Sequence, residues 1–202
     1  MSFFQNTCKP EGLGGKLMVQ MMNSGHGKMA KWGFSHIQVK GNENILDIGC
    51  GGGANIANWI DLCKKGHVTG IDYSEVSVDT STKKNKIAIS ENRCSVLQGN
   101  VLDLPFNDEK FDIASAFETI YFWPEIEKSF SQVYRVLKSG GKFMICNESD
   151  GTNEKDEKWT NTIKGMTIYD EKQLCDLLMN AGFKIVSIDN TTSHWICIIA
   201  EK

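Results

Sequence analysis

The chain has 202 residues, of which 41% are hydrophobic and 9% aromatic, and its formal net charge is −3 at pH 7. This length and composition predict one domain, with or without a small appendage, and exclude a disordered protein. Lysine and arginine form no long cluster, so nucleic acid is not expected as a partner, because phosphate binding relies on clustered basic side chains.

The cysteine pattern helps to predict the cellular compartment of the protein. Seven cysteines are scattered along the chain with no Cys-x-x-Cys pair, so neither a disulfide framework nor a metal site is predicted. The N-terminus lacks the pattern of a signal peptide, and no apolar run approaches the roughly 20 residues of a membrane span. We therefore expect a cytoplasmic protein that has no membrane partner.

Two short amphipathic helices are predicted before the first strand, over residues 13–22 and 27–39. His26 lies in the turn between them. Residues 1–40 precede a regular alternation of strands and helices, and they are treated as a unit of their own.

The most informative stretch is residues 45–54, which read ILDIGCGGGA. The apolar run is typical of a buried parallel strand, and a helix over residues 54–63 is predicted after the glycines. Glycine tolerates positive φ and has no Cβ, so the chain can turn tightly and let a ligand approach its backbone. The helix start adds free N–H groups and the positive end of a dipole. Doubly wound α/β proteins form a nucleotide pocket in this way.

The rest of the chain alternates strands and helices, which predicts a parallel sheet with right-handed crossovers. Two runs near the C-terminus read as a hairpin, which makes the last strand antiparallel. Segment 147–165 is polar and is expected to be a loop with at most a short helix. Strands are predicted over 67–72, 95–98, 111–117, 142–146, 183–189 and 193–201, and helices over 75–90, 124–138 (stopped by Gly140-Gly141) and 169–180.

Glycine spacing alone leaves two kinds of pocket open. Gly49-x-Gly51-x-x-Ala54 satisfies the dinucleotide fingerprint, and Asp72 lies at about the required distance of 20 residues downstream. Asp47, however, lies inside the strand end, where its charge would face the pyrophosphate of a dehydrogenase cofactor. A carboxylate there suits a ligand with a sulfonium and an ammonium group, such as S-adenosylmethionine.

Five stretches support the second kind of pocket, and they read ILDIGCGGG, VTGIDYS, LQGNVLDLPF, KFDIASAF and RVLKSGGKF, within residues 45–143. In order and spacing they resemble the motifs of the class I S-adenosylmethionine-dependent methyltransferases of the small-molecule type (methyltransferase domain 11-like). The resemblance implies an α/β, Rossmann-like, doubly wound sheet of seven mainly parallel strands in the order 3-2-1-4-5-7-6. It also implies a small N-terminal helical lid over residues 1–40 and a core domain over residues 41–202.

The resemblance assigns cofactor contacts along the second and third strands. Asp72 would accept the ribose hydroxyls, and Tyr73 would pack on the ribose or adenine. Asn100 stands where the family usually has an acid for the adenine amino group, which makes that contact weaker. Val101 would offer its backbone N–H to the adenine ring.

Further cofactor contacts are implied near the glycines. Gly49 and Gly51 would permit the approach of the cofactor to the backbone. Asp47 would orient the glycine loop and reach the ammonium group, directly or through water. Phe117, at the end of the fourth strand, would lie beside the methionine part.

Methyl transfer asks little of the protein, since a sulfonium is already activated and alignment supplies much of the rate. A base is needed only if the nucleophile arrives protonated. His26 and Tyr121 are the catalytic candidates, with Trp123 and Glu148 nearby. His26 would act as a base or substrate clamp, and a helix-capping or exposed histidine is the alternative. The acceptor is expected to enter between residues 13–40, 118–124 and 147–166.

The sequence thus predicts an enzyme that transfers a methyl group from S-adenosylmethionine to a small-molecule acceptor by in-line displacement. Segment 118–124 lacks the (Asn/Asp)-Pro-Pro-(Tyr/Phe) signature of amino-methylating nucleic-acid enzymes, which favours a small molecule. A protein that binds the cofactor without turnover is an alternative. An NAD-dependent oxidoreductase is a weaker one, because nothing in the sequence indicates a nicotinamide site.

Overall fold

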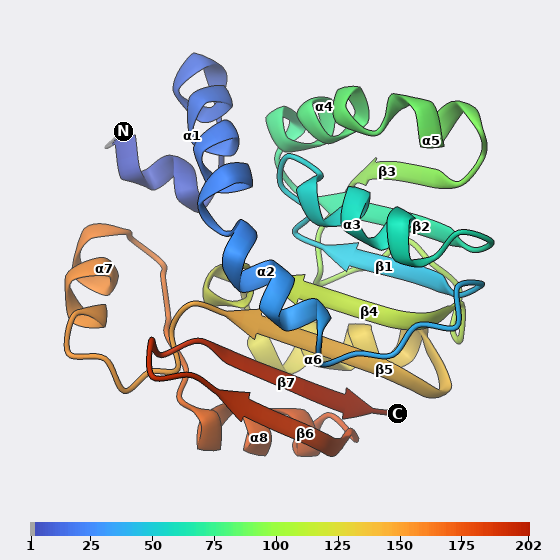
Figure 1. The fold of residues 1–202 in the computed structure, drawn as a ribbon. Coiled ribbons are helices and arrows are strands. Elements are labelled where there is room, and N and C mark those ends of the chain that lie inside the picture. Colours follow the sequence, from blue (N-terminus) through green and yellow to red (C-terminus); the bar gives the residue numbers. More distant parts are fainter. Residues whose placement is uncertain (1–2) are drawn as a thin grey trace.

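The computed structural model describes residues 3–202, and Figure 1 shows a central sheet with helices on both faces. The sheet has seven strands in the order β3-β2-β1-β4-β5-β7-β6. Strands β1 to β5 pair in parallel, and β7 pairs antiparallel with both β5 and β6. The strands are β1 (Asn44–Ile48), β2 (His67–Asp72), β3 (Cys94–Gln98), β4 (Phe111–Phe117), β5 (Leu137–Asn147), β6 (Lys184–Asn190) and β7 (Ile196–Glu201). The predicted order and directions are confirmed.

Burial along the central strands explains why they were readable in the sequence. Every side chain of β4 except Asp112 is buried. Ile113 packs in the apolar cluster on one face of the sheet, and Ala114 packs in the cluster on the other. A strand covered on both faces needs an almost continuous apolar run, which is the pattern that this segment shows.

Different helices cover the two faces of the sheet. Helices α6 and α8 pack on one face through Phe130 and Leu174, whereas α2, α3 and α5 pack on the other through Met29, Trp59 and Ala88. The helices are η1 (Phe3–Thr7), α1 (Gly12–Gly25), α2 (Gly27–Phe34), α3 (Ala54–Leu62), α4 (Glu75–Lys84), α5 (Lys86–Ser90), η2 (Ile120–Phe122), α6 (Ile126–Val136), α7 (Asp156–Thr162) and α8 (Glu171–Asn180). Within residues 3–202, no helix combines the length and the apolar character that crossing a membrane requires.

The N-terminal helices lie over the carboxyl ends of the parallel strands (Figure 1). A Cβ on Gly33 would lie 2.5 Å from the Sγ atom of Cys146, so only glycine lets α2 lie directly on β5. His26 follows α1 and precedes α2. The docking of α2 therefore sets where His26 lies relative to the sheet.

Several predicted boundaries are wrong. The helix expected over residues 27–39 ends at Phe34. Gly140-Gly141 does not stop a helix, because α6 ends at Val136 and β5 begins at Leu137, where Leu137 pairs with Phe111. The expected helix over 75–90 is broken at Asn85, whose side-chain amide donates to the carbonyls of Gly53 (3.1 Å) and Ser81 (3.0 Å). Asparagine side chains compete with helical hydrogen bonds in this way.

Candidate functional site

The glycine loop after β1 is held against β2. The N–H groups of Gly49 and Cys50 both donate to the carbonyl of Ile71, at 2.8 and 3.1 Å. Gly49 has a φ of +71°, and a Cβ there would lie 2.5 Å from Oγ1 of Thr119. Gly51 also has a positive φ, but a Cβ there would meet open space. The loop therefore packs tightly at Gly49 and leaves room for a ligand at Gly51.

Asp72, at the carboxyl end of β2, is anchored by two backbone donors. The N–H of Gly51 donates to Oδ2 and the N–H of Ser74 donates to Oδ1, both at 2.9 Å. Burial raises the pKa of Asp72, although these hydrogen bonds act in the opposite direction. Each carboxylate oxygen keeps a further lone pair, so this side chain is oriented to accept hydroxyl groups from a ligand.

Asp47 lies behind the loop. The hydroxyl of Ser115 donates to its Oδ1 at 2.7 Å, and the indole N–H of Trp59 donates to Ser115 at 2.9 Å. Burial, helped by the charge of Asp72, raises the pKa of Asp47 to about 7. The carboxyl group is thus held in the interior of the protein by β4, two residues before the glycine loop begins.

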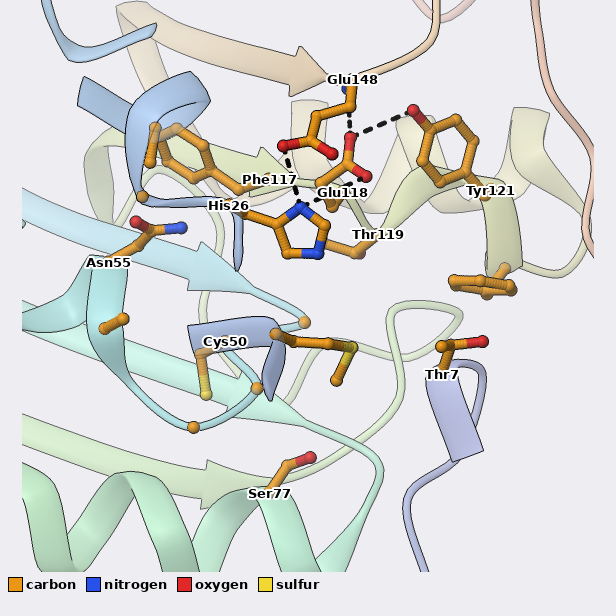
Figure 2. A pocket seen from close by; sticks show the side chains of 18 of the residues that line it. Thr7, His26, Cys50, Asn55, Ser77, Phe117, Glu118, Thr119, Tyr121 and Glu148 are labelled. Atoms are coloured by element: carbon orange, nitrogen blue, oxygen red, sulfur yellow. Dashed lines mark hydrogen bonds and ion pairs between the residues drawn. The ribbon is translucent and has the colours of Figure 1, made fainter. Parts of the chain in front are cut away.

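A second polar cluster gathers where β4 and β5 end, and Figure 2 shows its side chains pointing toward one another. Nδ1 of His26 lies 3.1 Å from Oε1 of Glu148 and 3.9 Å from Oε2 of Glu118. The hydroxyl of Tyr121 donates to Oε1 of Glu118 at 3.1 Å, and the backbone N–H of Glu148 donates to the same oxygen. We call these four residues the acid–histidine cluster.

Burial changes the acidity of this cluster. It raises the pKa of Glu118 to about 7, against the effect of the nearby His26. Burial lowers the pKa of His26, but the hydrogen bond to Glu148 and the charges of both glutamates outweigh it, and the net direction is upward. The pKa of Tyr121 is raised far above its ordinary value, mainly by burial. At neutral pH the tyrosine is therefore a neutral donor, whereas Glu118 titrates near that pH.

One cavity of about 970 Å³ joins the glycine loop to the acid–histidine cluster. Gly49, Gly51 and Asp72 line one end, and the whole cluster lines the other. All three segments predicted to surround the acceptor contribute to its wall. Five apolar side chains from the segments that follow the cluster also line the cavity, and we call this part the apolar chamber: Phe122, Trp159, Ile163, Met166 and Ile168. The polar Asn153, Lys155 and Asp156 line the cavity as well.

The cavity brings together six of the ten residues proposed from the sequence. These six are His26, Gly49, Gly51, Asp72, Phe117 and Tyr121. Phe117 lines the cavity together with Phe34 of α2, and the two ring centroids are 5.0 Å apart.

Four of the proposed residues lie outside the lining of the cavity. Asp47 is buried behind the loop. Tyr73 donates its hydroxyl to the carbonyl of Cys8. Asn100 accepts a hydrogen bond from the N–H of Leu102 at 3.0 Å, and Val101 is buried in the core. Their cofactor roles stay predictions.

Sequence reasoning missed Glu118. The residue directly follows Phe117 at the carboxyl end of a parallel strand, where ligands of open α/β sheets bind. That position was the signal that could have identified it. Trp123, considered with Tyr121, instead packs in the core and donates its indole N–H to Oγ1 of Thr119 at 2.6 Å.

The cluster also has the composition of a metal site. Ligand atoms of His26, Glu118 and Glu148 all lie within 4.8 Å of one another. Imidazole nitrogen and carboxylate oxygen both serve as metal ligands. The short contact between His26 and Glu148 is equally an ion pair, so the composition alone does not separate the two uses.

Comparisons with known proteins agree with this geometry. The sequence model of a methyltransferase domain matches residues 46–145. 24-Methylenesterol C-methyltransferase 3 of Arabidopsis thaliana is 31% identical over 159 residues, which cover 74% of this chain and 44% of that protein. The chain spans half the length or less of the curated relatives that it matches.

Solved structures show the same fold. A SAM dependent methyltransferase from Aquifex aeolicus aligns with a TM-score of 0.76 at 18% identity and covers 92% of this chain and 97% of that chain. Geranyl diphosphate C-methyltransferase from Streptomyces coelicolor, in complex with Mg²⁺, geranyl diphosphate and S-adenosyl-L-homocysteine, aligns with a TM-score of 0.74 at 16% identity, over 86% and 78% of the two chains. With its matched domain, five motifs and strand order, this chain belongs to the class I S-adenosylmethionine-dependent methyltransferase family.

Proposed function

We propose that this protein is an enzyme that transfers a methyl group from S-adenosylmethionine to a small, largely apolar acceptor. The observation that carries this proposal is the continuous cavity. One end offers an anchored carboxylate and an open glycine backbone, and the other end is an apolar chamber with a polar cluster at its base.

The residues at the loop end fit the cofactor. Asp72 would accept the ribose hydroxyls, because both of its oxygens are oriented by backbone donors and the residue lines the cavity. The space at Gly51 lets the cofactor approach the backbone, and Phe117 lies toward the cluster, beside the methionine part. When bound, the cofactor supplies an activated methyl group on a sulfonium.

Four cofactor roles rest on the family motifs rather than on the cavity. Asp47 would act through the glycine loop, which begins two residues after it. Tyr73 would reach the adenosyl group once its hydrogen bond to the carbonyl of Cys8 opens. Asn100 and Val101 would contact the adenine.

His26 and Tyr121 are the proposed catalytic residues. His26 is carried by the junction of α1 and α2, so residues 1–40 would act as a lid that brings the imidazole over the cavity and excludes water. Tyr121 stays neutral and holds Glu118 in place. Alignment of acceptor and methyl group would supply most of the rate.

The chamber favours an apolar acceptor, because it is lined by Phe122, Trp159, Ile163 and Met166. The similar proteins named above act on a methylenesterol and on geranyl diphosphate. An isoprenoid acceptor would fit the same kind of chamber. The seven free cysteines favour a reducing compartment such as the cytoplasm.

Calorimetric titration with S-adenosylmethionine, S-adenosylhomocysteine and NADH tests the cofactor. We expect the first two to bind at micromolar concentration and NADH not to bind. Binding of NADH alone would make the protein an oxidoreductase and overturn the proposal.

A transfer assay then tests the reaction, with a labelled methyl group and three probes: 24-methylenesterol, geranyl diphosphate and 2-naphthol. Label should pass to at least one of them. Tight cofactor binding without transfer to any probe would instead support a binding protein that lacks turnover.

A further inference from the structure

We propose that Glu118 is the general base of this site, and that the acceptor is a molecule whose methylation releases a proton, such as an alkene, an enol or a phenol. This inference rests on the proposed function and adds to it the identity of the base and the class of acceptor. It separates such acceptors from thiolates and other groups that reach the site already deprotonated.

The first argument is that the two carboxylate oxygens of Glu118 have different surroundings. Oε1 accepts from the hydroxyl of Tyr121 and from the backbone N–H of Glu148. Oε2 has His26 at 3.9 Å, which is beyond hydrogen-bond distance. One oxygen is thus fixed by two donors, and the other is available to a proton from a ligand.

The second argument is placement. Glu118 directly follows β4 and lines the cavity between the glycine loop and the apolar chamber, next to Phe117. Figure 2 shows its carboxyl group facing His26 across the end of the strand. A base must lie within hydrogen-bond reach of the proton that it removes, and this position borders the space where acceptor and methyl group would meet.

The third argument is an exit for the proton. Side-chain exposure rises from 18% for Glu118 to 35% for Glu148, and His26 lies between their carboxyl groups. Nδ1 of His26 faces both carboxyl groups, so closing the 3.9 Å gap to Oε2 would let a proton pass from Glu118 to His26 and then to the more exposed Glu148. His26 is then the second carrier of the proton rather than the group at the acceptor.

The pKa values of Glu118 and Tyr121 support the same assignment. The pKa of Glu118 is raised to about 7, chiefly by burial. A base is most effective when its pKa lies near the working pH. Tyr121 is a poorer base, because its proton is already donated to Glu118 and its pKa is far above neutral.

The reaction balances without a further reagent. The electron pair of the acceptor forms the bond to the methyl carbon, and the carbon–sulfur bond breaks with its electrons left on sulfur. The acceptor's proton passes to Oε2 of Glu118, and the electrons of the broken bond to hydrogen stay on the acceptor.

The direct test is Glu118→Gln in the full chain, with Glu127→Gln on the exposed surface of α6 as the matched control. Glutamine keeps an oxygen for Tyr121 and Glu148 but cannot take a proton. Single-turnover methyl transfer to 24-methylenesterol, geranyl diphosphate or 2-naphthol should fall by about 100-fold or more, in the range typical of a lost base. Calorimetric affinity for S-adenosylmethionine should change less than twofold.

A pH profile separates a base from a merely structural role. The wild-type rate should rise with pH through about 7, and this rise should disappear in Glu118→Gln. The titrating and charged neighbours are His26, Tyr121 and Glu148, with Asp156 of α7 beside Tyr121. Glu148→Gln should shift the profile while lowering the rate less than tenfold.

A measurement that needs no acceptor covers the case in which none of the three probes is methylated. Carbon-13 labelled glutamate, observed by NMR with S-adenosylhomocysteine bound, should show one carboxyl that titrates near pH 7 and is absent in Glu118→Gln. Titration of Glu118 below pH 5 would overturn the proposal.

Three other outcomes are decisive. Full transfer to 24-methylenesterol or 2-naphthol by Glu118→Gln would remove Glu118 as the base while leaving the proposed function standing. Dependence of the rate on added Mg²⁺ or Mn²⁺, and its loss with a chelator, would show that the cluster binds a metal instead. Failure of the wild type to bind S-adenosylmethionine would defeat the proposed function itself.

Discussion

The two ends of the cavity are built in different ways. At the loop end, a contiguous stretch from Ile45 to Ala54 and one carboxylate, Asp72, form the site mainly through backbone hydrogen bonds. At the other end, three segments far apart in the sequence bring His26, Glu118 and Glu148 together through side chains. The first arrangement is encoded locally, whereas the second exists only once the sheet and α2 have packed.

This contrast predicts how each end fails. Damage to the loop end should lower cofactor affinity or stability. Damage to the cluster or chamber should lower turnover or acceptor affinity and leave the cofactor bound.

The largest effect is expected at Gly49. Gly49→Ala would force a Cβ against Thr119 at a positive φ. Strain and overpacking together should cost about 2–4 kcal/mol of the free energy of unfolding. Gly140→Ala is the matched control, because Gly140 has φ +73° but open space around a Cβ, and it should cost only the strain of about 1–2 kcal/mol. Urea denaturation measures both variants. Equal losses of unfolding free energy would show that the contact with Thr119 adds no cost.

The next effect concerns Asp72. Asp72→Ala should weaken S-adenosylmethionine binding by about 1–3 kcal/mol, since hydrogen bonds to a charged group are lost. Asp79→Ala, on the exposed face of α4, is the control and should leave affinity unchanged. His26→Ala should do the reverse of Asp72→Ala, with nearly intact affinity and lower turnover. An unchanged dissociation constant in Asp72→Ala would remove this residue from the site.

Asp47 should make stability depend on pH. Its pKa is raised to about 7 in the folded protein, so its favourable contribution is complete below about pH 4 and is lost as pH rises to 7. Asp47→Asn can still accept from Ser115 and should stabilise the ligand-free protein by about 1–2 kcal/mol at pH 8. The gain should vanish near pH 4. Thermal unfolding at both pH values measures it, and a gain that does not vary with pH would contradict the buried-acid account.

The smallest effect is expected in the chamber. Trp159 is on α7 and contributes to the apolar wall. Trp159→Ala should raise KM for an apolar acceptor by about fivefold, equivalent to about 1 kcal/mol of lost burial. Calorimetric affinity for the cofactor should stay the same. A weaker cofactor and an unchanged KM would place the acceptor elsewhere.

Much of the fold could be predicted because its signals are local. The apolar run of β4 and the glycines after β1 were sufficient to place those elements. Asn85 and Gly140 were misjudged because their roles depend on contacts that the sequence does not display: the carbonyl of Gly53 in one case, and the pairing of Leu137 with Phe111 in the other.

The same difference between local and long-range signals explains which residues of the candidate site could be predicted. Asp72 and the glycines were recognised from their spacing, and they line the cavity. Glu118 was missed because its position after β4 indicates a ligand-binding edge of the sheet but not, by itself, a base. Its partners His26 and Glu148 are 92 and 30 residues away in the chain. The pairing of β4 with β5 brings Glu148 near, and the packing of α2 on β5 brings His26 near.

A crystal structure with S-adenosylhomocysteine bound tests the central claim most directly, namely that one cavity holds the cofactor and the acceptor. We predict ribose hydroxyls on the carboxylate of Asp72 and a sulfur atom that faces Glu118 and the chamber beyond it. A ligand whose ribose lies away from Asp72, or whose sulfur points away from the acid–histidine cluster, would contradict this account of both ends.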